Sequence, residues 1–116
     1  MEPKIINLEK CDWETMREKV QMKCFQGEYM TVQFAQIYEG HSISPHRHEY
    51  EQIAMILQGE CDFFVDGVAY PLQAGSIVDI PPNAEHYIVV KGPTPVINVD
   101  LFYPKRPDRK ESVEVR

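Results

Sequence analysis

Short runs of apolar and β-branched residues, separated by glycine and proline, are the feature that most limits what this chain can fold into. Such runs predict β-strands, and here they cover residues 30–38, 52–57, 61–65, 76–80, 86–90 and 96–103. The segments 58–60 (Gln-Gly-Glu) and 66–67 (Asp-Gly) are turn signals between neighbouring runs, which indicates successive hairpins. The only helical prediction is residues 13–19, over at most two turns.

So many short strands in a chain of 116 residues predict an all-β fold. An open sheet would expose unpaired edges, whereas a closed sandwich or jelly roll removes them. The length suits a single domain with its own core. We therefore expect one barrel domain with an N-terminal strand extension over residues 1–106. Residues 107–116 are charged and unpatterned, which predicts a mobile C-terminal tail.

Composition narrows the class of protein further. Hydrophobic residues make up 43% of the chain, so a core can form without cross-links. Cys11, Cys24 and Cys61 are odd in number and form no CxxC pair, which favours a reducing compartment and buried, unpaired thiols. No stretch reaches the roughly 20 apolar residues of a membrane span, and the N-terminus lacks the pattern of a secretory signal. We expect a cytoplasmic location.

The charge balance argues against nucleic acid as a partner. The formal net charge is −6 and the pI is near 5.1, whereas binding to phosphate backbones depends on clustered Lys and Arg. One local basic cluster exists, made of Lys105, Arg106, Arg109 and Lys110, and acidic residues interrupt it. It is better suited to a local site or a solvated tail.

A group of potential metal ligands stands out, comprising His46, His48, Gln52 and His86. In a strand, alternate side chains share a face, so the first three would point to one side. Nitrogen and amide ligands of this kind suit nickel, iron, manganese, copper or zinc, and the sequence leaves the metal open. Because all of these ligands are neutral, the ion would keep its full charge, favour anionic substrates and act as a Lewis acid. The alternative is a set of buried, hydrogen-bonded histidines; His41 is expected to be a loop residue.

Residues 96–103 alternate in character, which predicts a strand with one apolar face and one more polar face. Its odd members, Ile97, Val99, Leu101 and Tyr103, are apolar, while its even members include Asn98, Asp100 and Phe102. The even face is therefore the better candidate to line a polar cavity, and the odd face to pack.

The ligand residues lie in two runs that resemble the two motifs of the cupin family. The runs are GHSISPHRHEYEQ over residues 40–52 and GSIVDIPPNAEH over residues 75–86. Two departures are visible: Gln52 stands where many cupins have Glu, and Asn83 and Val90 stand where the second motif often has Gly and Asn. His-x-His-x-x-Glu-Gln is the form of a subset that includes the KdgF type of small cupin, and Asn tolerates the left-handed backbone that Gly would supply. Residues 12–14 and 99–108 also resemble segments of that type.

This resemblance implies a double-stranded β-helix with one divalent transition metal. It also implies that Asp100, Phe102 and Arg106 lie beside the metal, where Asp100 would move a proton and Arg106 would clamp a carboxylate. Tyr50 and Tyr87 flank the ligands as expected walls of the substrate pocket. Other roles stay open: Asp100 as a buried partner of Arg106, and Phe102 or the tyrosines as ordinary packing residues.

The function that the resemblance implies is that of a metal-dependent enzyme acting on a sugar acid. For the KdgF type this is linearisation of the cyclic 4,5-unsaturated monouronates from pectin or alginate, an isomerase reaction. Two alternatives remain, since one fold supports many functions: a metal-dependent dioxygenase, and a non-catalytic module that binds or senses a sugar or similar small molecule. We expect a homodimer, because small cupins pair and the apolar odd face of residues 96–103 would otherwise be exposed.

Overall fold

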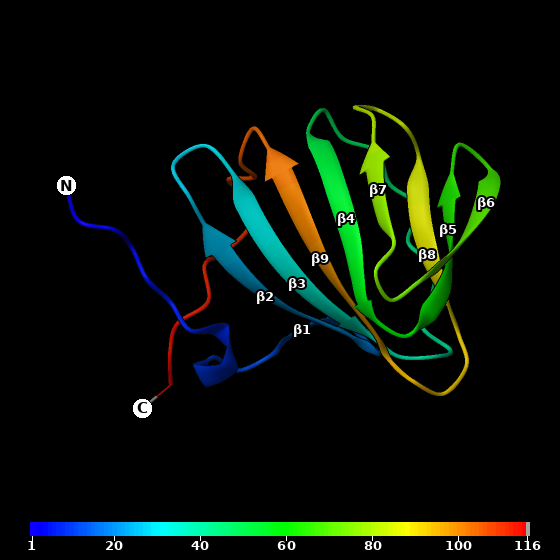
Figure 1. Cartoon of the computed structure of the whole chain (residues 1–116), viewed down its shortest axis with the longest axis horizontal. Helices are drawn as coiled ribbons and strands as arrows, with labels where there is room; N and C mark the ends of the chain where they lie inside the picture. Colours follow the sequence, from blue (N-terminus) through cyan, green and yellow to red (C-terminus); the bar gives the residue numbers. More distant parts are fainter. Residues whose placement is uncertain (116) are drawn as a thin grey trace.

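The computed structural model describes residues 1–115 and confirms an all-β fold (Figure 1). A single turn of 3₁₀-helix, Leu8–Lys10, precedes the strands. The strands are β1 (Glu14–Arg17), β2 (Val20–Gln26), β3 (Thr31–Ile37), β4 (Glu51–Gln58), β5 (Glu60–Val65), β6 (Val68–Gln73), β7 (Ile77–Ile80), β8 (His86–Lys91) and β9 (Val96–Tyr103). Within residues 1–115, no helix is long and apolar enough to cross a membrane.

The strands form two antiparallel sheets that face each other. The larger sheet has the order β1-β2-β3-β9-β4-β7 and the smaller one the order β6-β5-β8. Figure 1 shows the larger sheet curving from the blue strands to the green ones, with β5, β6 and β8 grouped at one side. β9 lies in the middle of the larger sheet and pairs along its length with β3 and β4. The last strand of the chain therefore holds together segments that are distant in sequence.

The predicted turns form the hairpins, and Gly59 shows why the residue type matters. Gly59 connects β4 to β5 with a φ of +86°, a conformation that suits glycine. A Cβ atom there would lie 2.8 Å from the carbonyl oxygen of Pro95. Both the backbone conformation and the close approach of the chain before β9 therefore require glycine.

The prediction of a helix over residues 13–19 was wrong. Glu14–Arg17 is strand β1, which pairs with β2 in the register Glu14↔Met22. Here the hydrogen bonds offered by a neighbouring strand outweigh a weak local helix preference. The strand candidates from the sequence also omitted β2 and β6. β6 contains Pro71 and lies at a sheet edge, the position where a strand accommodates proline.

The C-terminal segment is tied to the barrel, which the mobile-tail prediction did not anticipate. The backbone N–H of Ser112 donates to the carbonyl of Cys24 at 2.8 Å. The Ser112 hydroxyl accepts from the Cys24 N–H, also at 2.8 Å, and Glu111 accepts from the Gln26 N–H. β1 pairs only with the first part of β2, so the tail supplies partners where β1 ends. Arg116 lies outside the described residues.

The interior between the sheets contains two groups of buried apolar side chains. The larger comprises Val20, Ala35, Ile37, Ile56, Cys61, Val90 and Val96, and the smaller comprises Ala54, Phe63, Ile80 and Ala84. The three cysteines are buried and unpaired, as predicted. On β9 the even members are buried and face this interior, whereas the odd members are partly exposed. The expected polar face is therefore the inner one, and the apolar odd face lies outside.

Adjacent residues of β4 provide a test of this packing. Ile56 is 1% exposed and Leu57 is 47% exposed. Ile56→Ala removes fully buried apolar groups and leaves a cavity, so we expect a loss of about 3 kcal/mol in the free energy of unfolding. Leu57→Ala, the matched control, should lower the free energy of unfolding by less than about 1 kcal/mol. Urea unfolding measures both, and equal losses would contradict the assignment of the inner face.

Candidate metal centre

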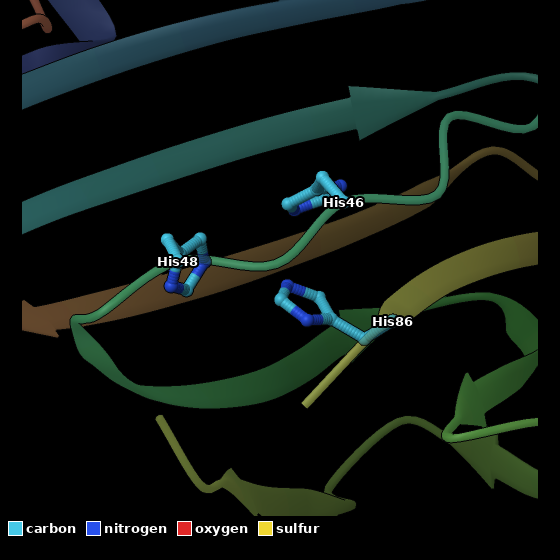
Figure 2. Close-up of side chains that lie close together, drawn as sticks. All are labelled: His46, His48 and His86. Atoms are coloured by element: carbon cyan, nitrogen blue, oxygen red, sulfur yellow. The ribbon is translucent and has the colours of Figure 1, made fainter. Parts of the chain in front are cut away.

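Three histidines meet where the loop before β4 passes the start of β8. His46 and His86 form an isolated antiparallel bridge, with backbone N···O distances of 3.2 and 2.9 Å. The ring centroids lie 4.2 Å apart for His46 and His86, and 4.9 Å apart for His48 and His86. One nitrogen from each of the three rings lies within 4.8 Å of the others. Figure 2 shows the rings turned toward a common point.

The rings converge for a different reason from the one predicted. His46 and His48 lie in the loop before β4, not in a strand, so strand alternation does not align them. The loop is held instead by the bridge to His86 and by the Asn83 N–H, which donates to the carbonyl of His48 at 2.7 Å. Asn83 has a φ of +68°, the left-handed conformation expected from its place in the motif. Gln52 lies in β4 and is 5% exposed.

Backbone hydrogen bonds select the ring nitrogen that each histidine presents. The Nδ1 atoms of His46, His48 and His86 lie 2.7, 3.2 and 2.9 Å from the backbone carbonyls of Ser44, Tyr50 and Ala84. A carbonyl only accepts, so each Nδ1 carries the proton and each Nε2 of a neutral ring has a free lone pair. Such contacts orient metal-binding histidines. The three Nε2 atoms are therefore the candidate ligand atoms.

Gln52 brings an oxygen to the same place. Its side-chain Nε2 donates to Asp100 Oδ1 at 2.9 Å, which turns the amide oxygen toward His48. Gln52 Oε1 lies 3.1 Å from His48 Nε2, so two acceptors face each other. Neighbouring ligand atoms that each lie about 2.1 Å from one metal are about 3 Å apart. A shared cation relieves the repulsion between these lone pairs, and this donor set fits a divalent transition metal.

Asp100 is buried directly behind Gln52. Its Oδ1 accepts from Gln52 and its Oδ2 accepts from Asn98 Nδ2, each at 2.9 Å. Burial disfavours the charged carboxylate and raises the pKa of Asp100 to about 6, although both amide hydrogen bonds and the charge of Arg106 act in the opposite direction. The hydrogen-bond partners of Asp100 are amides, so the alternative pairing with Arg106 is not formed.

Arg106 contacts the aromatic residues of the site. Its guanidinium carbon lies 4.9 Å from the ring centroid of Phe102 and 5.5 Å from that of Tyr50, within reach of cation–π attraction. Two of its nitrogens donate to the carboxylate of Asp108, at 3.3 and 3.0 Å. Phe102 is 2% exposed and packs edge-on to His48, so it belongs to the core and to the site wall together.

A cavity of about 130 Å³ adjoins His46 and His86. Its lining includes the predicted residues His46, Gln52, His86, Asp100, Phe102 and Arg106, and also Tyr87, whose ring stacks on Phe64. Four further polar residues line the cavity that were not among the predicted site residues: Arg17, Gln33, Asn98 and Arg109. The alternation of residues 96–103 already placed Asn98 on the polar face. Nothing in the sequence indicated Gln33, and Arg109 was visible only as part of the basic cluster.

Comparison with known proteins identifies the class. The family model for the cupin domain matches residues 33–102, which is more than half of the chain and includes both histidine motifs. The chain belongs to the cupin family.

Solved structures agree on the fold. An RmlC-like cupin from Shewanella frigidimarina is 25% identical, with a TM-score of 0.82, over 92% of this chain and 96% of that one. KdgF from a Halomonas species is 24% identical, with a TM-score of 0.83, over 92% of this chain and 98% of that one.

A shorter match in sequence links the chain to a curated enzyme. Dimethylsulfoniopropionate lyase DddW from Ruegeria pomeroyi is 36% identical over 57 residues, which are 49% of this chain and 38% of the enzyme. The chain therefore matches well under half of the length of that enzyme.

The donor set predicts metal binding that depends on the clustered histidines. After incubation with nickel, iron(II), manganese or zinc and removal of the excess, we expect about one ion per chain. His86→Ala should abolish stoichiometric binding, because it removes a buried ligand atom. His41→Ala is the matched control, because His41 lies outside the cluster, and it should keep the ion. Elemental analysis gives the ratios, and equal metal contents in the two variants would contradict the site.

The raised pKa of Asp100, about 6 against an ordinary value of 3.8, predicts how the stability of the metal-free protein depends on pH. Between these values the folded state holds the extra proton, so the contribution of Asp100 to stability is present below pH 4 and is lost as the pH rises through about 6. Asp100→Asn removes this dependence. The free energy of unfolding of the variant, relative to that of wild type, should therefore rise by about 2 to 3 kcal/mol from pH 4 to pH 7. Urea unfolding at several pH values tests this, and a constant difference would rule it out.

Proposed function

We propose that this cupin is a metal-dependent enzyme that acts on a sugar acid. One observation supports this most: a buried carboxyl group with a pKa of about 6 lies beside the candidate metal ligand Gln52, in a cavity that three arginines also line. Among the described residues that line this cavity, Asp100 is the only carboxylate, whereas three residues are arginines: Arg17, Arg106 and Arg109. The cavity therefore favours an anionic ligand.

The reaction that fits these groups is the linearisation of a cyclic 4,5-unsaturated uronate. Opening breaks the bond between the ring oxygen and the anomeric carbon and gives an enol. A proton leaves the anomeric hydroxyl, another is added at C4, and the enol becomes a ketone, so the net change is an isomerisation. When bound, the metal supplies Lewis acidity toward the sugar oxygens.

The residues of the chain have separate roles in this proposal. The carboxyl group of Asp100 carries the proton, since a pKa near the working pH suits a group that both accepts and donates. Arg106, held over Phe102 and Tyr50 by stacking and by Asp108, binds the substrate carboxylate. The proposal is supported by the fold that this chain shares with the solved KdgF structure. The resemblance of residues 99–108 to the KdgF type supports a position beside the metal for Asp100, Phe102 and Arg106.

A second candidate is cleavage of dimethylsulfoniopropionate, which the partial match to DddW favours. That reaction would remove a proton from the carbon next to the carboxylate and release dimethyl sulfide and acrylate. Asp100 and Arg106 could fill the same roles, as proton acceptor and carboxylate clamp. The two candidates differ in substrate charge, because a uronate is an anion whereas a sulfonium is a cation. The three arginines that line this cavity would repel the sulfonium.

The assay is the loss of ultraviolet absorbance of a 4,5-unsaturated galacturonate, with dimethyl sulfide release from dimethylsulfoniopropionate measured in parallel. We expect metal-loaded wild type to speed the loss of absorbance. Asp100→Asn should keep the metal and lose at least about 100-fold in kcat, whereas Arg106→Ala should mainly raise KM. No acceleration over buffer would overturn the uronate proposal, binding without turnover would favour the sensor alternative, and wild-type rates for Asp100→Asn would remove its assigned role.

A further inference from the structure

Three buried side-chain atoms in the described part of the chain have no hydrogen-bond partner: Arg17 Nε, His86 Nε2 and Asn98 Oδ1. All three belong to residues that line the one cavity beside the histidines. Most buried polar groups in proteins are paired, so each exception needs a reason. For His86 Nε2 the reason is its place among the candidate metal ligands. Asn98 is 5% exposed and is not a member of that set.

The orientation of the Asn98 amide follows from its neighbour. Asn98 Nδ2 donates to Asp100 Oδ2 at 2.9 Å. A flipped amide would place its oxygen against the carboxylate, so the Asn98 oxygen must point away from Asp100. Gln52 shows the same arrangement, since its amide nitrogen also donates to Asp100 and its oxygen faces His48. Asp100 therefore turns two amide oxygens away from itself, one toward the histidines and one without a protein partner.

An unpaired, buried carbonyl oxygen costs about 1 to 3 kcal/mol, and its partner must be a donor. A cationic amine is a poor candidate, because Arg17, Arg106 and Arg109 line the same cavity. A hydroxyl group donates without carrying charge. The arginines and Asn98 together thus suit a ligand with an anionic group and a hydroxyl group.

We propose that Asn98 Oδ1 accepts a hydrogen bond from a hydroxyl group of the ligand in this cavity and so selects hydroxylated acids over their deoxy counterparts. The inference builds on the proposed function and specifies its substrate class. Dimethylsulfoniopropionate has no hydroxyl group and would leave this oxygen unpaired.

The test compares the affinities of matched ligands by titration calorimetry with zinc-loaded protein. The probes are galacturonate and its 2-, 3- and 4-deoxy analogues, together with lactate and propionate. For wild type we expect one deoxy analogue to bind about 10-fold more weakly than galacturonate, which is the effect of leaving one buried acceptor unpaired. In Asn98→Val this penalty, the loss of affinity caused by removing the hydroxyl group, should fall below about 2-fold. The penalties for the other deoxy analogues should stay as they were in wild type.

Gln33→Leu is the matched control. Gln33 also lines the cavity, but its amide oxygen already accepts from Arg109 Nε at 3.0 Å. This variant should keep the wild-type penalty whatever happens to its overall affinity. If Asn98→Val fails to fold or to bind zinc, Asn98→Thr replaces it. A threonine hydroxyl can donate to Asp100 and still accept from a ligand, so the penalty should then be partly retained.

The outcomes separate this inference from the proposed function. If no uronate binds to wild type, the sugar-acid proposal fails, and the comparison of lactate with propionate still tests Asn98. A wild-type preference for hydroxylated ligands that is unchanged in Asn98→Val would overturn the inference. Equal affinities for hydroxylated and deoxy ligands in both series would also overturn it, because the oxygen would then be satisfied by water alone.

Discussion

The antiparallel pairing of β9 with both β3 and β4 is the interaction on which the rest of the structure depends. It brings the last strand between two segments that are distant in the chain, in the registers Gln33↔Asp100 and Ala54↔Asp100. Because side chains alternate across a strand, this register directs Asn98, Asp100 and Phe102 inward. A slip of one residue would replace them with Ile97, Val99 and Leu101 and would remove every polar group that β9 brings to the cavity.

Asp100 is the electrostatic centre of that arrangement. A buried carboxylate without a cationic hydrogen-bond partner is costly, and two amide donors compensate only part of the cost, since the pKa remains raised to about 6. In return, Asp100 orients Gln52 and Asn98 and determines where both amide oxygens lie. Groups with such perturbed pKa values are often found at functional sites. The same carboxyl group can thus arrange the site and, in the proposed reaction, carry a proton.

Local patterns predicted the parts of the fold that depend on neighbours in sequence. The apolar run of residues 96–103 matches the bounds of β9, and Gly59 lies in the predicted turn. The same patterns missed β1, because its extended form depends on pairing with β2. They also missed the attachment of Ser112 to Cys24. This attachment forms because β1 ends before it reaches Cys24, and only the folded sheet shows where β1 ends. At the site, the spacing of the histidines was informative even though strand alternation was the wrong explanation for their convergence.

The sequence by itself determined the all-β class, the cupin motifs and the identity of the residues that could bind a metal, because residue type and spacing are local properties. Only the tertiary structure decided which atoms face each other. The bridge between His46 and His86 aligns the rings, and backbone carbonyls select their Nε2 atoms. Asp100 turns the oxygens of Gln52 and Asn98 away from itself. These contacts join residues up to about 50 positions apart, and hydrogen-bond geometry at that separation depends on strand register and not on local pattern.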